Sequence, residues 1–362
     1  TLLQDQIPSA SYDAIAGVIT AELGQSPDAI FSEFAREPVA SASVAQVHRA
    51  VLKSGAVVAV KVRRPGVAEQ ATFDEAIMVM AVRVFALIPT VEALSPVETV
   101  HEFCAAVRLQ LDFRREADNN REFRTNFAGS DTIFFPSLHD DLCTESVLVM
   151  EFVDGVKDSG LDQLDLDRKR LAKIGGEAIL KMVYTDGFVH ADLHPGNILF
   201  QPDHRVTFID LGMVGRIDPQ RRNALAGMIM ALARGDGRTV ARYMYEGSPR
   251  KQVKDYGAYE AAVVELVRET SQKTVAEMEH AVFIAQVMEV LRRHRLQADA
   301  AFTTINIAMI VVEGLGKKLD PDLDLFTFIQ PYLFRVLAAA PAEFRVVVTD
   351  STPHPVQPVV PG

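Results

Sequence analysis

Apolar positions at the start of the chain change from helical to strand spacing. Residues 10–36 carry apolar side chains at helical intervals from Ser11 onward, and Pro27 is placed to start a second short helix. Residues 44–52 and 56–62 show alternating and β-branched apolar side chains on either side of a Lys-Ser-Gly turn. This second pattern predicts a β-hairpin that follows a helical extension.

Helical spacing returns after the hairpin. Residues 67–88 predict one helix, which Pro89 closes. A second helix is expected to begin at Ser95, where a capping serine, a first-turn proline and Glu98 follow in order, and to run to about residue 127. These helices separate the hairpin from the next strand pattern.

Three short apolar runs predict further strands. Residues 146–152 read as a buried strand, and residues 167–187 as a helix. Residues 198–200 and 206–209 are joined by a Pro-Asp-His-Arg turn, which predicts a second hairpin.

After this hairpin the pattern is mainly helical. Asp218 and Pro219 resemble a helix cap and first turn, and helical spacing continues to about residue 337. No Ala-Pro-Glu sequence follows the hairpin, so a peptide-docking segment of the protein-kinase type has little room. The Pro-rich residues 351–362 predict a disordered tail or linker.

Composition narrows the class of protein. The 362 residues are 48% hydrophobic and 23% charged, which is typical of a globular protein with one or two cores. A net charge of −11 without a Lys/Arg-rich run argues against nucleic-acid binding and simple adhesion to anionic lipid. Cys104 and Cys143 are expected to be reduced, which favours a cytoplasmic compartment.

Targeting and membrane signals are weak. No apolar run reaches the roughly 18 residues that a membrane span needs, because Arg83 interrupts residues 76–89 and Glu313 interrupts residues 305–315. No signal peptide is visible, and Thr1 in place of Met suggests that the start of the protein lies upstream.

The candidate chemistry lies between residues 190 and 212. The five-residue step from Asp192 to Asn197 matches a kinase catalytic loop, with Ala191 in place of arginine, and Asp210 begins an Asp-Leu-Gly sequence where kinases have Asp-Phe-Gly. A single such match arises easily by chance as a polar turn. The two matches together favour a nucleotide-phosphate site in which Asn197 and Asp210 hold Mg²⁺ and Asp192 serves the attacking oxygen.

A phosphate-binding lysine is predicted upstream. Lys61 lies in Val-Ala-Val-Lys-Val, which is similar to the kinase strand whose lysine contacts the α and β phosphates. The preceding segment overlays a Gly-rich loop with alanine at each glycine position, and an ordinary packed segment is the alternative. The expected nucleotide-covering residues are Ala40, Ser41, Ala42, Ser43, Val44, Ala45 and Gln46.

Two further roles remain open on the residues alone. A kinase-type lysine needs a helix glutamate, and either Glu75 or the more distant Glu116 could serve. Residues 146–152 could form the hinge, with Met150 lining an adenine pocket and the backbone of Glu151 and Val153 binding the base, or simply a core strand. His190 is expected to be a structural residue of the catalytic loop, and His194 a turn residue.

Taken together, these segments resemble the UbiB/AarF/ADCK family of atypical kinase-like proteins. The resemblance implies an α+β, two-lobed protein-kinase-like fold with a helical insertion, binding of ATP and Mg²⁺, and a role in ubiquinone, other isoprenoid-quinone or lipid metabolism. It also assigns Glu116 as the partner of Lys61. The segments that carry it are residues 39–67, 111–120, 148–155, 190–197 and 209–215.

The chain departs from the family pattern in three ways. The N-terminal Lys-x-Gly-Gln segment of the family is absent from this chain, and the family's Glu-x-Asp pair reads Gln110-Leu111-Asp112. C-terminal membrane spans common in the family are not present either. Autoinhibition and substrate choice are therefore open.

These observations yield a domain scheme and competing functions. We expect an ATPase or small-molecule kinase, with a non-catalytic nucleotide-sensing module as the alternative and a Ser/Thr protein kinase as the third choice. Expected partners are ATP and a small-molecule, quinone-related or lipid substrate, with possible peripheral membrane association. The predicted domains are an extension at 1–36, an N-lobe at 37–152 with an insertion at about 67–110, a mostly helical C-lobe at 153–350, and the tail at 351–362.

Overall fold

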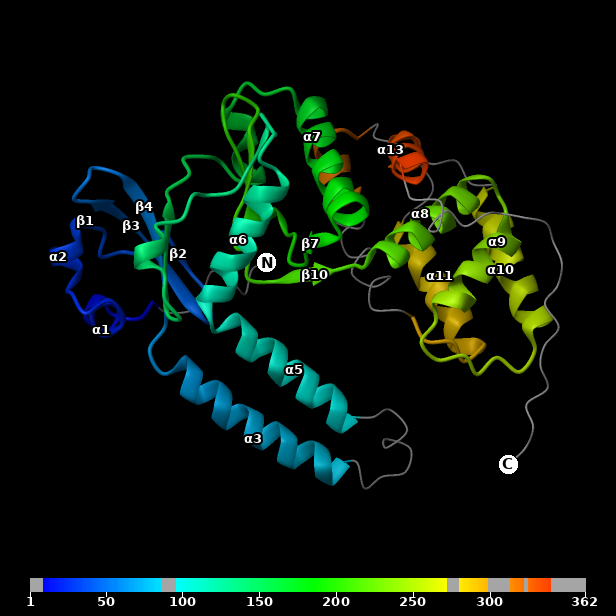
Figure 1. Ribbon diagram of the computed structural model, residues 1–362, viewed down its shortest axis with the longest axis horizontal. Coiled ribbons are helices and arrows are strands. Elements are labelled where there is room, and N and C mark those ends of the chain that lie inside the picture. Colours follow the sequence, from blue (N-terminus) through cyan, green and yellow to red (C-terminus); the bar gives the residue numbers. More distant parts are fainter. Residues whose placement is uncertain (1–8, 86–95, 272–279, 299–312, 322–324, 340–362) are drawn as a thin grey trace. The chain divides into compact units, whose positions relative to one another are not determined.

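The computed structural model describes residues 9–85, 96–271, 280–298, 313–321 and 325–339 (Figure 1). Pro89, Ser95, residues 305–312 of the apolar run and the Pro-rich tail lie outside these residues. The chain divides into two compact units, of which the first comprises Thr1–Ile179, Phe188–Gly215 and Gly314–Pro321, and the second comprises Leu180–Gly187, Arg216–Glu313 and Asp322–Gly362. The lobe boundaries expected from the sequence remain a prediction.

An antiparallel sheet organises the first unit. The predicted hairpin is confirmed as β3 (Ala45–Leu52) and β4 (Val57–Arg63). On the other side of β4 lies β6 (Val147–Glu151), which confirms the strand predicted over residues 146–152. The short strand β2 (Ala40–Ser41) and the edge strand β1 (Phe31–Phe34) both pair with β3.

Side chains alternate between the two faces of this sheet. Val62 and Val147 face the side on which Ile15 and Ile19 of α1 (Tyr12–Leu23) complete a buried cluster. On the opposite face, Leu148 packs in a second cluster with residues of α6 (Phe113–Asn126). The sheet is therefore covered by a helix on each face.

The N-terminal helices start where the sequence predicts. Ser11 caps α1, its Oγ accepting a hydrogen bond from the Ala14 N–H, and Pro27 begins the short helix α2 (Pro27–Ile30). The helical expectation for residues 31–34 was wrong. This segment forms β1, because its pairing with β3 and the burial of Phe31 outweigh its local preference.

The helical insertion consists of α3 (Val67–Phe85) and α5 (Pro96–Gln110), which lie side by side in Figure 1. A single helix to about residue 127 was expected, and this was wrong. The helix breaks at Leu111, whose carbonyl accepts a hydrogen bond from the Arg63 guanidinium at 2.7 Å. Asp112 then caps α6 through a bond from the Arg114 N–H at 3.1 Å, and α6 starts in a new direction.

The second hairpin is confirmed as β8 (Ile198–Phe200) and β9 (Val206–Phe208), with β5 (Ile133–Phe134) parallel to β9. The strand β7 (Phe188–His190) pairs with β10 (Val214–Arg216) beside the candidate catalytic loop.

The predicted helix over residues 167–187 is α7 (Arg168–Leu180) followed by a wider π-type turn. Short helices among the described residues are η2 (Asp140–Leu142), η3 (Asp158–Gln163), η4 (Lys181–Asp186), which is the π-type turn, and η5 (Pro195–Asn197).

The second unit is helical in its described part. Asp218 caps α8 as predicted, its carboxylate accepting a hydrogen bond from the Arg221 N–H at 2.9 Å. Tyr259 is fully buried at the centre of the core and donates to the Ala241 carbonyl at 2.9 Å. Its α-helices among the described residues are α8 (Pro219–Ala233), α9 (Gly237–Gly247), α10 (Tyr256–Ser271), α11 (His280–Arg293) and α13 (Leu325–Ala339). Among the described residues of the whole chain, none of the helices is both long and apolar enough for a bilayer crossing.

Candidate active site

Lys61 joins two carboxylates that are far apart in the sequence. Its Nζ lies 2.8 Å from Glu116 Oε2 on α6 and 3.0 Å from Asp210 Oδ1, just after β9. Lys61 is opposite Leu148 in the strand register, so its side chain leaves the sheet on the face that α6 covers. The contact with Glu116 agrees with the family resemblance, whereas Glu75 pairs with Arg108.

Charge and burial act in opposite directions on this cluster. Burial alone lowers the pKa of Lys61, but the charges of Glu116 and Asp210 outweigh it, and the pKa is raised. Burial raises the pKa of Glu116, whose side chain is only 6% exposed. The Lys61 ammonium lowers the pKa of Asp210, whose side chain is 48% exposed. One ammonium thus faces a buried carboxyl and an accessible carboxylate.

The backbone at Asp210 is unusual. Its φ of 58° lies in the left-handed region, which costs energy for a residue with a Cβ. Both neighbours are held in place: the Ile209 N–H donates to the Asn197 carbonyl at 2.9 Å, and Asn119 Nδ2 donates to the Leu211 carbonyl at 2.8 Å. Surrounding hydrogen bonds therefore stabilise the conformation that directs Asp210 toward Lys61.

His190 orders the candidate catalytic loop. Its Nδ1 accepts a hydrogen bond from the Asp192 N–H at 3.2 Å, so its Nε2 carries the proton and donates to the Ile209 carbonyl at 3.2 Å. The ring is fully buried, and burial lowers its pKa, which keeps it neutral. These contacts link the loop to the segment before Asp210. They agree with the structural role expected for His190.

Asn197 and Asp192 lie on the same turn. Asn197 Nδ2 donates to the Asp192 carbonyl at 3.1 Å, which leaves Asn197 Oδ1 as an available acceptor. His194 forms the turn itself, since its Nδ1 accepts from the Gly196 N–H at 3.0 Å. The Asp192 carboxylate is 45% exposed and available to a ligand.

The donor set suits a magnesium ion held against phosphates. Asn197 and Asp210 supply one amide oxygen and one carboxylate, and the described residues contain no cluster of three or more His, Cys, Asp or Glu side chains able to hold a metal. Mg²⁺ in nucleotide sites needs only one or two protein carboxylates, because phosphates and water complete its octahedron. The residues present therefore fit such an ion.

The alanine-containing loop has ordinary backbone geometry. Ala40 pairs with Val47, and the Ala42 N–H donates to the Ala45 carbonyl at 2.8 Å. None of residues 40–46 has a positive φ, so alanine is tolerated where a Gly-rich loop would use left-handed conformations.

Gln46 differs from the rest of the loop. It is fully buried and lies in register with Val62, on the sheet face opposite Lys61. Its Oε1 accepts a hydrogen bond from the Ala10 N–H at 2.6 Å. The Gln46 side chain is therefore directed toward the residues before α1.

The expected hinge residues lie at the end of β6. Met150 belongs to the buried cluster on the Lys61 face of the sheet. The Glu151 N–H donates a hydrogen bond to the Ser137 carbonyl at 2.8 Å, whereas the Val153 N–H donates to no other described residue. Of the three expected hinge residues, Met150 is directed toward the candidate nucleotide site, and Val153 has a backbone donor to offer.

Comparison with known proteins decides the family. Residues 2–244 match the ABC1 atypical kinase-like domain, and residues 263–324 match the UbiB helical domain. The chain belongs to the ABC1 atypical kinase-like family. The kinase-like α+β fold with a helical C-terminal part and the UbiB family resemblance are thereby confirmed.

Several relatives of this ABC1 family chain are similar over most of its length. "Probable protein kinase UbiB" of Marinobacter nauticus is 33% identical over 91% of the chain, and the protein of that name from Pseudomonas fluorescens is 34% identical over 92%. The chain spans 62% and 64% of the length of these two relatives. A protein named "Uncharacterized protein sll1770" from Synechocystis is 31% identical over 92% of the chain, and the match covers 58% of the length of that protein.

A solved structure shares the ABC1-type fold. It is titled "The complex structure of Rv3197-erythromycin from Mycobacterium tuberculosis" and matches 89% of this chain and 83% of its own, with a TM-score of 0.61. Its sequence identity of 22% limits the comparison to the fold.

Sequence reasoning missed one residue of the candidate site. Asn119 follows Glu116 by three positions on α6, so both side chains lie on the same helix face. Glu116 also accepts a hydrogen bond from the Leu211 N–H, while Asn119 binds the Leu211 carbonyl. The spacing of the two polar side chains was the available signal, but their target could not be identified without the fold.

Proposed function

We propose that this protein binds Mg²⁺ and ATP and transfers or hydrolyses the terminal phosphoryl group of the nucleotide. The observation that supports this most is the pairing of Lys61 with Glu116 and Asp210, on a unit that also carries Asp192 and Asn197 beside each other. Phosphoryl transfer requires mainly positioning and charge from the protein, and these side chains supply both.

Each side chain has a distinct role in this proposal. Lys61 binds phosphate oxygens, and Glu116 orients it. Asp192, with its accessible carboxylate, positions the attacking hydroxyl or water and accepts its proton. Asn197 and Asp210 would hold Mg²⁺, which neutralises phosphate charge when bound. Residues 40–45 cover the nucleotide, and the hinge near Met150 receives the adenine.

We place the reaction in isoprenoid-quinone or lipid metabolism, because relatives at 33–34% identity carry the name UbiB. A small-molecule acceptor fits better than a peptide. Helix α8 begins at Pro219, seven positions after Gly212 (219 − 212), so little chain remains to form a peptide-docking segment. Water is the acceptor if the protein acts as an ATPase.

A non-catalytic nucleotide sensor is the second candidate. Its support is the alanine-containing loop, whose conventional φ angles lack the left-handed turns by which Gly-rich loops bring backbone amides close to phosphate. A sensor would gain thermal stability with Mg-ATP or ADP but release no product.

An ADP-release assay with Mg²⁺ distinguishes these functions. Asp210→Asn removes the carboxylate charge at nearly constant volume, and we expect it to lower turnover by about 100-fold or more. Asp131→Asn is the matched control, because Asp131 is exposed and lies outside the cluster. Equal turnover of Asp210→Asn and the parent would exclude this catalytic site. Nucleotide-dependent stabilisation of a parent that makes no ADP would support the sensor.

A further inference from the structure

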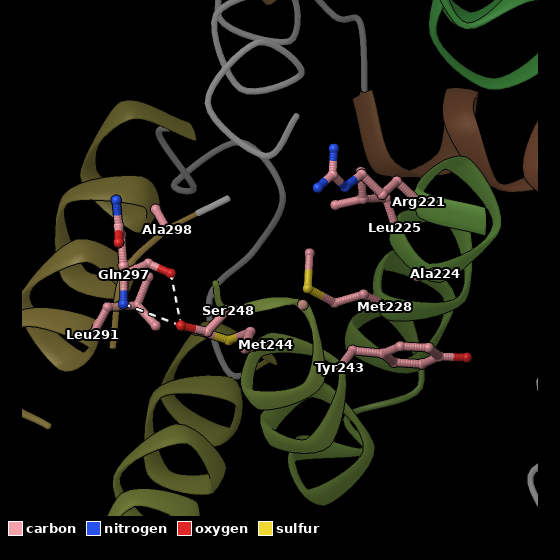
Figure 2. A pocket seen from close by; sticks show the side chains of 11 residues that line it. Arg221, Ala224, Leu225, Met228, Tyr243, Met244, Ser248, Leu291, Gln297 and Ala298 are labelled. Atoms are coloured by element: carbon pink, nitrogen blue, oxygen red, sulfur yellow. Dashed lines mark hydrogen bonds between the residues drawn. The ribbon is translucent and has the colours of Figure 1, made fainter. Parts of the chain in front are cut away.

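A cavity of about 90 Å³ lies within the helical second unit. Figure 2 shows it between residues of α8, such as Leu225 and Met228, and the facing residues Leu291, Gln297 and Ala298. Helix α9 contributes the remaining wall. The lining residues that the structure describes all belong to the second unit.

The wall of this cavity is mainly apolar and adaptable. Leu225, Met228, Met244 and Leu291 supply hydrocarbon and thioether groups, and Met228, Met244 and Leu291 also pack in or against the buried core of the unit. Methionine side chains are unbranched and polarisable, so they adjust to ligands of different outline. An apolar wall of this kind gives water few hydrogen-bond partners.

Two polar side chains of the wall, those of Ser248 and Arg221, already have partners. Ser248 Oγ lies 2.6 Å from the Arg250 carbonyl and 2.9 Å from the Gln297 carbonyl, and it accepts a hydrogen bond from the Gln297 N–H at 3.1 Å. Arg221 Nε lies 3.4 Å from the Asp218 carboxylate. A charged ligand would have to compete with these contacts, whereas a hydrocarbon group would leave them intact.

We propose that this cavity is a binding site for a neutral hydrocarbon group of about the size of one ring or one branched five-carbon unit. The volume exceeds the roughly 10–15 Å³ that one water needs, and apolar cavities of order 150 Å³ are known to bind benzene. Such a group could belong to a free small molecule or to the end of a longer amphiphile. The site is separate from the proposed phosphoryl-transfer chemistry and does not require it.

Gly247 lies at the exposed rim of the cavity, where a larger side chain can be added without a clash. It is the last residue of α9, lines the cavity, and a Cβ added there meets no atom within 4 Å. Gly247→Leu therefore adds a large apolar side chain at the rim of the cavity, where it narrows the opening. Gly17→Leu is the control, since Gly17 lies exposed within α1 and also has open space around it. Ala224→Leu narrows the cavity independently from α8.

The proposal is tested by measuring the binding of fluorobenzene to the full chain by ¹⁹F NMR. We expect saturable broadening with the parent and with Gly17→Leu, and at least a tenfold weaker effect with Gly247→Leu and Ala224→Leu. Far-UV circular dichroism and thermal melting verify that each variant is folded. Should one filling variant fail to fold, the other gives the result, and displacement of fluorobenzene by excess geraniol from the parent gives an independent one.

Three outcomes would overturn the proposal: a signal in the parent that does not saturate, equal binding by a folded filling variant, or equally tight binding of 4-fluorobenzoate. The last would show that the site does not prefer neutral groups. Since no assay here uses ATP, failure of this proposal and failure of the proposed phosphoryl transfer are distinguishable.

Discussion

Asn119 Nδ2 donates a hydrogen bond to the Leu211 carbonyl at 2.8 Å, across 92 residues of sequence. The helix that carries Glu116 is thereby fastened to the residue after Asp210. The bond lies outside the Lys61 cluster itself, but it fixes the carbonyl of the residue that follows Asp210, whose own backbone is left-handed. This relationship assigns Asn119 a positioning role.

Asn119→Ala should lower ADP release by about tenfold while changing stability little, because one hydrogen bond of a half-buried amide contributes about 1 kcal/mol. If the role is positioning, kcat falls more than KM rises, and Asn119→Asp, which cannot donate, behaves like Asn119→Ala. Arg115→Ala, an exposed change on the same helix, is the control. Unchanged kcat in Asn119→Ala would contradict the positioning role.

Lys61→Met should destabilise the protein by about 3 kcal/mol, because it leaves the buried Glu116 without its ammonium partner. Removing the ammonium raises the pKa of Glu116 further, and a carboxyl with a raised folded-state pKa loses stability as pH rises. The defect should therefore be larger at pH 8 than at pH 5.5 in urea unfolding. Lys61→Met/Glu116→Gln should recover part of the loss, and a pH-independent defect would argue against this explanation.

The buried imidazole of His48 should lower the free energy of unfolding in acid. Its Nδ1 lies 2.9 Å from the Ala35 carbonyl, and its Nε2 is buried without a partner among the described residues. Burial lowers the pKa of His48 in the folded protein. Below pH 6.5 the imidazole is therefore protonated in the unfolded chain while it stays neutral in the folded one. Stability then falls with decreasing pH by up to about 1.4 kcal/mol per unit, until the folded-state pKa is reached.

His48→Asn keeps a donor for the Ala35 carbonyl but cannot titrate in this range. We expect a shallower dependence of the free energy of unfolding on pH between 6.5 and 5 than in the parent. Identical slopes for His48→Asn and the parent would mean that His48 is not the titrating group. His190 contributes in both proteins, since its pKa is also lowered.

Gly187→Ala should destabilise the second unit by more than about 2 kcal/mol. The φ of Gly187 is 66°, and an added Cβ would lie 2.3 Å from the Ile217 carbonyl oxygen, so both strain and a backbone clash oppose the substitution. Gly175→Ala in α7, where a Cβ meets open space, should instead be neutral or stabilising by up to about 1 kcal/mol. Thermal or urea unfolding of the two variants checks the difference.

The local parts of this protein could be predicted from its sequence. Alternation specified the β3–β4 hairpin, and Ser11 and Asp218 identified helix starts, because capping and side-chain periodicity act within a few residues. The break at Leu111 could not be predicted in the same way. It depends on Arg63, which is 48 positions away along the chain and binds the carbonyl freed at the break.

The candidate site also has one part that could be predicted from the sequence and one part that depends on distant residues. The sequence by itself determined which residue types were available, since Asp192, Asn197 and Asp210 follow a recognisable spacing. The spacing of residues left both Glu75 and Glu116 open as the partner of Lys61, and the family resemblance favoured Glu116. Only the tertiary structure shows the contact itself, the direction of Gln46 away from the site, and the bond from Asn119 to Leu211. The physical reason is that these outcomes depend on strand register and helix placement, which are set by burial of apolar faces across the whole unit and by no local signal.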